Sequence, residues 1–284
     1  MNKVTLHDGP TLPALGLGTW RLGESARRRT AEVAAVRLAL RLGYRVVDTA
    51  EMYGEGGAEE VVGQAFAEAI AAGEVRREDV FVVSKVYPHN ASRAGAVAAC
   101  RRSLQRLGLR QLDLYLLHWR GQHPLRDTVA AFEALVAEGL IRHWGVSNFD
   151  IADMQELLAL PQGARCAVDQ VYYALSERGP EVALLPWLRR HGIACMAYSP
   201  IDQGKLAGDA ALAAIGQRRG ASAAQVALAW ALRQPGVMAI PKAVREDHLR
   251  ENLAAADVEL DDADVDELER RFPRPRGKAP LAMI

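Results

Sequence analysis

The sequence predicts a single α/β domain folded as a (β/α)8 barrel, also called a TIM barrel. Two observations predict this fold: the chain has 284 residues, and eight short apolar segments alternate with helical segments along it. A barrel of this kind needs about 250 residues, so one domain over residues 1–284 accommodates the chain. Strict strand–helix alternation is typical of a parallel sheet with right-handed crossovers.

The predicted strands are short, and the predicted helices lie between them. The strands cover residues 15–18, 45–48, 80–85, 112–118, 143–147, 166–170, 194–198 and 237–240. The helices cover residues 30–41, 57–71, 91–107, 125–138, 150–160, 181–191 and 222–233, and an eighth, 245–255, follows the last strand. The alternative is an open doubly wound sheet. Its GxGxxG phosphate fingerprint is not matched by residues 16–21, which disfavours it.

Three further segments lie outside the eight units. Residues 3–13 predict an N-terminal β-hairpin that turns at residues 7–10. The long loop 201–221 is expected to carry a short helix of its own, and residues 261–271 predict an extra C-terminal helix. The basic, proline-rich tail 273–284 is expected to be loosely ordered.

Composition excludes several classes of function. The 35 basic and 35 acidic side chains give zero net charge, so neither nucleic acid nor an anionic membrane is expected as a partner. Cys100, Cys166 and Cys195 form no CxxC pair, which argues against a disulfide framework and a structural zinc site. The N-terminus has no apolar signal core and no segment is long enough to span a bilayer, so we expect a cytoplasmic protein.

Polar side chains gather where the predicted strands end. They are Asp48, Lys85, His118, Ser147 with Asn148, Gln170, Tyr198 with Ser199, and Lys242. The carboxyl ends of barrel strands meet at one rim, where active sites of this fold lie. Seven such ends on one rim indicate a site. Asp113 stands near the start of its strand, at the opposite end, and is interpreted as structural.

Asp48, Tyr53, Lys85 and His118 form a plausible proton-transfer group. Reduction of a carbonyl needs a hydride on carbon and a proton on oxygen. A phenol has an ordinary pKa of about 10, and a nearby lysine ammonium is expected to lower that pKa. Asp48 is expected to hold Lys85 in place, and His118 to donate a hydrogen bond to the substrate oxygen.

Other chemistries fit the sequence less well. It contains no HExxH or clustered ligand set, so no catalytic metal is expected, and no GxSxG nucleophile elbow. A lyase or isomerase that forms a Schiff base on Lys85 or Lys242 is an alternative. It requires a neutral lysine, which an adjacent Asp48 opposes for Lys85.

Five segments together resemble the aldo-keto reductase family. They are residues 43–54, 81–85, 112–119, 139–149 and 240–252, and the resemblance covers almost the whole chain. It implies that Asp48, Tyr53, Lys85 and His118 are the catalytic tetrad, that the protein is a monomer, and that NADPH is the cofactor.

The resemblance also implies a cofactor site. Ser147, Asn148 and Gln170 match the residues that hold the nicotinamide carboxamide. Tyr198 matches the aromatic residue on which the nicotinamide ring stacks. Further matches are Ser199 and Pro200 beside that ring, Gly18, Thr19 and Trp20 near its ribose together with Asp48, and Lys242, Ala243, Arg245, His248, Glu251 and Asn252 at the adenosine-phosphate end.

Three positions depart from the family pattern. Ala243 stands where Ser or Thr is common, and His248 stands where Arg is common. A histidine is mostly neutral at pH 7 and cannot clamp a phosphate as arginine does, so NADH is expected as a second usable cofactor. Tyr87 replaces the usual tryptophan of its loop.

The substrate pocket is expected to be lined by Trp20, Tyr53, Tyr87, His118 and Trp119. Aromatic walls suit small aldehydes and α-dicarbonyls. Residues 117–121 resemble bacterial members associated with methylglyoxal reduction, and Arg120 either attracts an anionic substrate or is solvated. The predicted function is NAD(P)H-dependent reduction of aldehydes and ketones. The alternative is a non-catalytic cofactor-binding regulatory module.

Overall fold

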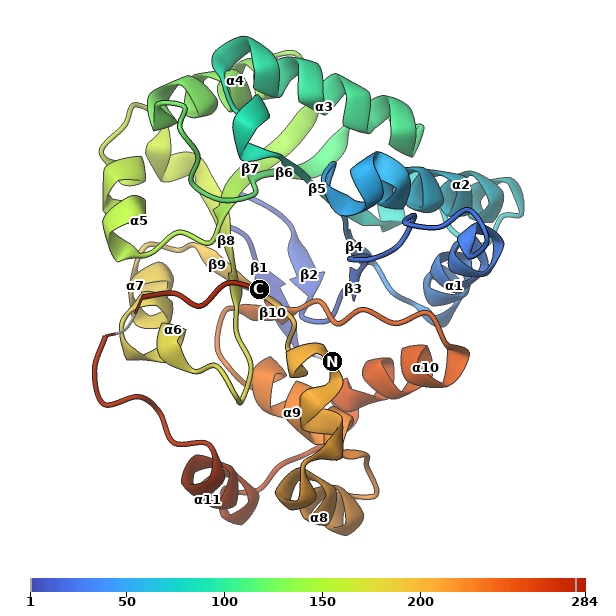
Figure 1. Ribbon diagram of the computed structural model, residues 1–284, viewed down its shortest axis with the longest axis vertical. Helices are drawn as coiled ribbons and strands as arrows, with labels where there is room; N and C mark the ends of the chain where they lie inside the picture. The colour runs from blue at the N-terminus through green and yellow to red at the C-terminus, as the bar shows by residue number, and fades with distance from the viewer. Residues whose placement is uncertain (1, 279) are drawn as a thin grey trace.

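The computed structural model describes residues 2–278 and 280–284. Its centre is a sheet of eight parallel strands in the order β10-β9-β8-β7-β6-β5-β4-β3 (Figure 1). The strands are β3 (Leu17–Gly18), β4 (Val46–Asp48), β5 (Phe81–Val86), β6 (Leu112–Leu117), β7 (Ile141–Ser147), β8 (Cys166–Tyr172), β9 (Ala194–Tyr198) and β10 (Val237–Ala239). The predicted strands agree with these to within two residues at each end.

The sheet closes on itself next to its first and last strands. Gly16 N donates to Ala239 O at 2.9 Å, and Gly18 N donates to Pro241 O at 3.0 Å. A Cβ atom at Gly18 would lie only 2.6 Å from Ile240 O, so the approach of the two chain segments requires glycine there. The fold is therefore a (β/α)8 barrel, and the alternative of an open doubly wound sheet is wrong.

Helices surround the barrel (Figure 1). They are α1 (Arg29–Leu42), α2 (Gly57–Ala71), α3 (Arg93–Leu107), α4 (Leu125–Ala137), α5 (Ile151–Leu158), α6 (Gly179–Val182), α7 (Leu184–Arg190), α8 (Ala210–Arg219), α9 (Ala223–Leu232), α10 (Glu246–Ala254) and α11 (Asp262–Arg271). α8 lies in the long loop, and α11 is the extra C-terminal helix that the sequence predicts.

One predicted helix is divided in two. The sequence predicts a single helix over 181–191, whereas the structure has α6 and α7 with Ala183 between them at φ −145°. Pro186 explains the break, because a proline has no N–H to donate to the carbonyl four residues earlier and its ring clashes with that carbonyl.

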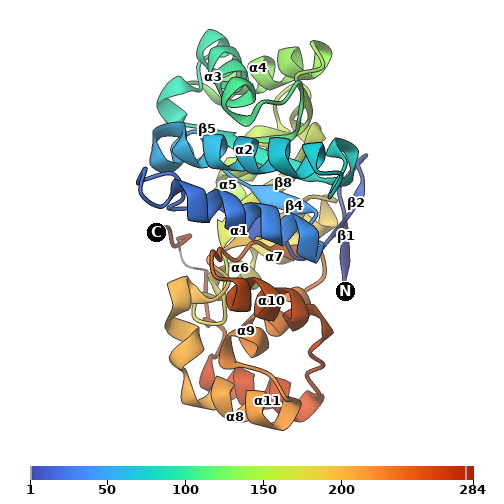
Figure 2. The same cartoon turned by 90° about the vertical axis from the view of Figure 1, so that its right-hand side faces the viewer.

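On β5 and β6, alternate side chains belong to two different hydrophobic clusters, an inner one and an outer one. On β5, Phe81 and Val83 pack in the inner cluster, whereas Val82 packs in the outer cluster beneath the helices. The hairpin of β1 (Lys3–Thr5) and β2 (Thr11–Pro13) contributes Val4 and Leu12 to the inner cluster. The hairpin lies on the opposite side of the barrel from the C-terminus (Figure 2). It covers the amino end of the barrel, opposite the carboxyl ends of the strands.

Within the described ranges, no helix has both the length and the apolar character needed to cross a bilayer. The end of the chain returns to the barrel. Leu281 and Ala282 pack partly buried against the outer cluster, and Figure 1 shows the C-terminus over the centre of the strands.

Candidate active site

A cavity of about 790 Å³ opens at the carboxyl ends of the strands. Most of the site residues predicted from the sequence line it. They are Gly18, Thr19, Trp20, Asp48, Tyr53, His118, Trp119, Ser147, Asn148, Gln170, Tyr198, Ser199, Pro200, Lys242, His248, Glu251 and Asn252. Residues from seven β/α units therefore meet at one place.

Lys85 is the centre of the predicted proton-transfer group and is wholly buried behind it. Its Nζ donates to Asp48 Oδ2 at 2.7 Å, to Thr49 O at 2.9 Å and to Tyr53 Oη at 3.1 Å. A bulky carbonyl compound in the cavity cannot reach this amine. The Schiff-base alternative for Lys85 is therefore disfavoured by access as well as by charge.

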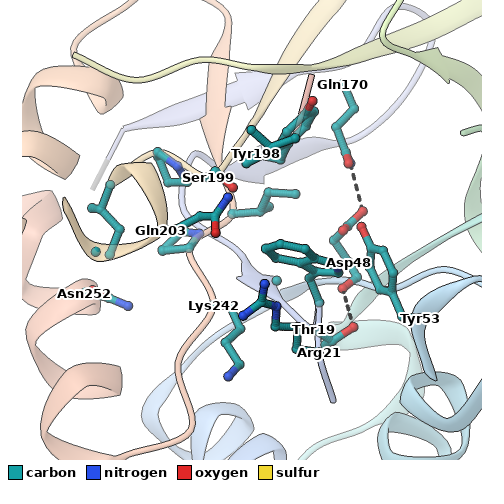
Figure 3. Close-up of a pocket in the computed structure, with 18 of the residues that line it drawn as sticks. Thr19, Arg21, Asp48, Tyr53, Gln170, Tyr198, Ser199, Gln203, Lys242 and Asn252 are labelled. Carbon is teal, nitrogen blue, oxygen red and sulfur yellow. Dashed lines mark hydrogen bonds between the residues drawn. The ribbon is translucent and has the colours of Figure 1, made fainter. Parts of the chain in front are cut away.

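Burial and charge have opposite effects on the pKa of Lys85. Burial alone would lower the pKa of Lys85, but Asp48 and Tyr53 outweigh it, so the pKa lies above its ordinary value. Gln170 Nε2 donates to the other carboxylate oxygen of Asp48 at 2.8 Å, and Figure 3 shows Asp48 between Gln170 and Tyr53. The lysine therefore stays a charged ammonium at neutral pH.

The pKa of Tyr53 corrects the expectation from the sequence. Lys85 does act to lower this pKa, but burial is the larger influence, and the pKa of Tyr53 lies above its ordinary value. The phenol is consequently protonated at neutral pH. The Tyr53 hydroxyl is thus held in its protonated form, 3.1 Å from the Lys85 ammonium.

The His118 ring contacts the Tyr53 ring edge-on at the cavity, with ring centroids 5.6 Å apart and an angle of 75° between the rings. Burial, aided by Lys85, lowers the pKa of His118 well below its ordinary value, so the imidazole is neutral. In the described part of the chain its buried Nδ1 has no hydrogen-bond partner. A buried donor without an acceptor is costly, which favours the proton on Nε2.

A hydrogen-bonded wall adjoins the tetrad on strands β7 to β9. Tyr198 Oη donates to Asn148 Oδ1 at 2.9 Å, and Asn148 Nδ2 donates to His118 O at 3.1 Å. Ser147 Oγ donates to Gln170 O at 2.8 Å. Asn148 has a φ of 60°, which asparagine tolerates better than most residues. The wall presents fixed amide groups beside one aromatic ring.

The far end of the cavity is lined by two exposed side chains, Lys242 and, in the first turn of α10, His248. Ala243 and Arg245 were predicted here but do not line the cavity. Arg245 instead forms a two-point ion pair with Asp247, with Nε 3.0 Å from Oδ1. Its guanidinium is therefore already engaged by a carboxylate.

Two other predicted contacts lie outside the cavity. Tyr87 packs edge-on against Trp119, with ring centroids 5.0 Å apart, and stands behind it. Arg120 is paired with Glu156 at 2.8 Å and lies near Asp153 on α5. The structure supports neither interpretation of Arg120, as a free solvated side chain or as a substrate contact, because its guanidinium is paired with carboxylates of α5.

Several lining residues were missed by the sequence analysis. Arg21, Gln203 and Gly204 line the cavity from loops, and Met283 and Ile284 reach it from the end of the chain (Figure 3 shows Arg21 and Gln203). Strand-end reasoning covers only the first residues after each strand. The glycine in 203–204 was the one available signal for a turn at the rim, and nothing in the sequence placed the tail there.

Comparison with known proteins gives the same assignment along the chain. Residues 14–271 match the model of the aldo/keto reductase family. The chain is 50% identical to methylglyoxal reductase YeaE of Escherichia coli over 279 residues, which cover 96% of each protein. It is 37% identical to a glyoxal reductase of Bacillus subtilis, over 94% of this chain and 92% of that one.

Solved structures are similar over the full length. An aldo-keto reductase from Klebsiella pneumoniae, crystallised with NADPH, superposes with a TM-score of 0.94 and 46% identity, and each chain is covered completely. With this agreement in motif, fold and site, the chain belongs to the aldo/keto reductase family and is an oxidoreductase of that family.

Proposed function

We propose that the chain reduces small aldehydes and ketones to alcohols with NADPH, and that Tyr53 gives the proton to the carbonyl oxygen. One observation carries the proposal. The Tyr53 hydroxyl lines the cavity and lies 3.1 Å from a lysine ammonium that is itself sealed from the cavity. The ammonium can therefore stabilise the phenolate without reacting with the substrate.

The residues present fit NADPH. Its nicotinamide would lie against the Tyr198 ring, and its carboxamide would meet Ser147, Asn148 and Gln170, which offer donors and acceptors. Its adenosine phosphate would lie near the cation of Lys242 and the amides that begin α10, both of which favour phosphate. When bound, NADPH supplies the hydride for the carbonyl carbon.

The chain's own groups handle the oxygen. His118, neutral and with its proton on Nε2, donates a hydrogen bond that orients the carbonyl oxygen. Tyr53 then transfers its proton to that oxygen, and Lys85 stabilises the phenolate that remains. Asp48 keeps Lys85 charged and in position, and Trp20 and Trp119 exclude water from the substrate.

Small aldehydes and α-dicarbonyls such as methylglyoxal are the proposed substrates. Aromatic side chains form the wall near Tyr53, which suits a compact carbonyl compound. The names of the bacterial methylglyoxal and glyoxal reductases, to which the chain is similar, support the same class. NADH is a second usable cofactor, because Ala243 has no hydroxyl and Arg245 is held by Asp247.

We expect the enzyme to act as a monomer in the cytoplasm. Cys100, Cys166 and Cys195 are buried free thiols, which fits a reducing compartment. Sedimentation of the purified protein gives its mass in solution, and a dimer at micromolar concentration would contradict the expectation.

The test compares the wild type with Tyr53→Phe. NADPH and NADH are titrated by fluorescence, and turnover of methylglyoxal and 4-nitrobenzaldehyde is followed by the loss of cofactor absorbance. We expect turnover to fall by about 10²–10⁴-fold in the variant while NADPH still binds. Tyr173→Phe is the matched control, because it removes a phenol that donates to Glu181 outside the cavity. Tight NADPH binding without turnover in the wild type would instead favour the regulatory-module alternative.

A further inference from the structure

Glu51 is a buried acidic residue in the segment between β4 and Tyr53. The residue is 9% exposed and does not line the cavity. A carboxylate removed from water loses its hydration and needs several partners to offset the loss. The identity of those partners shows which parts of the molecule Glu51 connects.

The partners of Glu51 lie on the next β/α unit. Its Oε1 accepts the backbone N–H of Tyr87 at 2.6 Å and the Nδ2 of Asn90 at 3.0 Å. Its Oε2 lies 3.6 Å from an Arg102 guanidinium nitrogen on α3. Hydrogen bonds to an ionised acceptor are shorter and about twice as strong as neutral ones. Glu51 thus ties the segment before Tyr53 to the segment after β5.

The segment that Glu51 holds also supports the aromatic wall of the cavity. The Tyr87 ring packs edge-on against Trp119 at 5.0 Å, and Trp119 in turn lies 4.8 Å from the His118 ring. Trp119 and Tyr53 line the same cavity from different loops. The Glu51 carboxylate therefore connects the loop that carries Tyr53 to the segment whose Tyr87 ring packs against Trp119.

We propose that Glu51 is a positioning residue that fixes the Tyr53 hydroxyl relative to the wall formed by His118 and Trp119. This inference rests on the proposed role of Tyr53 as proton donor. Without the carboxylate, the Tyr87 N–H and the Asn90 amide lose their acceptor, and the two loops lose their shared anchor. A displacement of about 1 Å at a reacting group can cost about 10²-fold in rate.

A purely structural role predicts a different pattern of effects. If Glu51 served stability alone, its loss would lower Tm and leave kcat of the folded protein unchanged. A positioning role lowers kcat and leaves NADPH affinity unchanged, because neither Glu51 nor its partners belong to the wall of Ser147, Asn148 and Tyr198 or to the Lys242 end.

The experiment uses Glu51→Ala, Glu51→Gln and the matched control Glu55→Gln, an exposed glutamate of the same loop. For each protein we measure kcat and KM with methylglyoxal, the Kd of NADPH, and Tm. We expect kcat of Glu51→Ala to fall about tenfold or more with an unchanged Kd. Glu51→Gln should stay within about threefold of the wild type, because its amide oxygen still accepts from Tyr87 and Asn90. Glu55→Gln should match the wild type.

A wild-type kcat in Glu51→Ala would overturn the inference, and so would a Glu51→Gln variant as slow as Glu51→Ala. If Glu51→Ala does not fold, Glu51→Asp replaces it. That variant keeps the charge but is one methylene too short to reach the Tyr87 N–H, so the same fall in kcat is expected and a wild-type kcat would refute the role. If the wild type is active and Glu51→Ala has the same kcat, only the positioning role is refuted. A wild type without turnover refutes the proposed function and this inference together.

Discussion

Asp48 and Asp113 are buried carboxylates at opposite ends of the barrel, and each is 2% exposed. Each is paired with a cation: Lys85 Nζ lies 2.7 Å from Asp48, and an Arg77 guanidinium nitrogen lies 2.8 Å from Asp113. The two pairs have the same elementary chemistry. The difference between them lies in what else touches the cation and the carboxylate.

At the amino end, every neighbour of Asp113 completes the structure. The carboxylate accepts the Val82 N–H at 2.9 Å and lies 3.4 Å from Arg142. The Arg77 and Arg142 side chains reach solvent. At the carboxyl end, Lys85 has no access to solvent, and its third contact is the Tyr53 hydroxyl in the cavity. On the proposed function, the Asp113 pair serves folding, because its arginines reach solvent, and the Asp48–Lys85 pair serves chemistry, because it contacts a titratable hydroxyl at the cavity.

The sharpest way to break this comparison is to remove the cation beside Tyr53. Lys85→Met keeps the length of the side chain but removes the ammonium that stabilises the Tyr53 phenolate. We expect kcat for methylglyoxal to fall by about 10²–10⁴-fold. The variant leaves Asp48 buried without its cation, so Tm is measured beside kcat, and Lys85→Met/Asp48→Asn serves as the charge-balanced control. Retention of more than about a tenth of the wild-type kcat would contradict the role given to Lys85.

Asp113→Ala tests the other end. It leaves the buried Val82 N–H without its acceptor, which costs about 1–3 kcal/mol, whereas the Arg77 guanidinium can still reach solvent. We expect the free energy of unfolding in urea to fall by roughly this amount, while kcat per folded molecule stays at the wild-type value. A lower kcat in a fully folded Asp113→Ala sample would show that the amino end of the barrel affects the site at the carboxyl end.

The alternation of strands and helices was enough to predict the barrel. Eight short apolar strands, each followed by a helix, fit a parallel sheet that is covered by helices and closed on itself. The agreement extends to α2, whose predicted bounds 57–71 are those of the structure. The break between α6 and α7 was missed even though Pro186 marks it, because the apolar pattern continues through it.

The sequence predicted the cavity-lining residues that lie within one or two positions of a strand end. Asp48, His118 and Gln170 follow from strand ends and barrel geometry alone. The sequence could not show that burial outweighs Lys85 in setting the pKa of Tyr53, since that depends on the packing around the phenol. Nor could it show that Ile284, far along the chain, returns to line the cavity.

His248→Arg sharpens the comparison at the phosphate end of the cavity. A guanidinium holds a phosphate by two charge-assisted hydrogen bonds, which a mostly neutral imidazole cannot do. We expect the ratio of kcat/KM for NADPH to that for NADH to rise by about tenfold, with the NADH value unchanged. In the wild type, NADH should be less than about a thousandfold poorer than NADPH. An unaltered ratio in the variant would place the phosphate away from α10.

The neutral state of His118 predicts a small effect of pH. Its pKa in the folded protein lies below the unfolded value of about 6.5, so below that pH the unfolded chain binds a proton that folded His118 does not. The contribution of His118 to stability therefore declines as the pH falls through about 6.5, by at most about 1.4 kcal/mol per pH unit. Urea unfolding of the wild type and His118→Gln between about pH 5 and 7.5 isolates the contribution of His118 to the pH dependence of the free energy of unfolding. Equal slopes in the two proteins would mean that His118 keeps an ordinary pKa.

The proton-donor role of Tyr53 is tested most directly by single-turnover kinetics. Enzyme in excess, loaded with NADPH, is mixed with 4-nitrobenzaldehyde, and the loss of cofactor absorbance gives the rate of the chemical step without product release. We predict that Tyr53→Phe slows this step by about 10²-fold or more, whereas Tyr173→Phe does not. Equal single-turnover rates in the wild type and Tyr53→Phe would contradict the assignment of the proton to Tyr53.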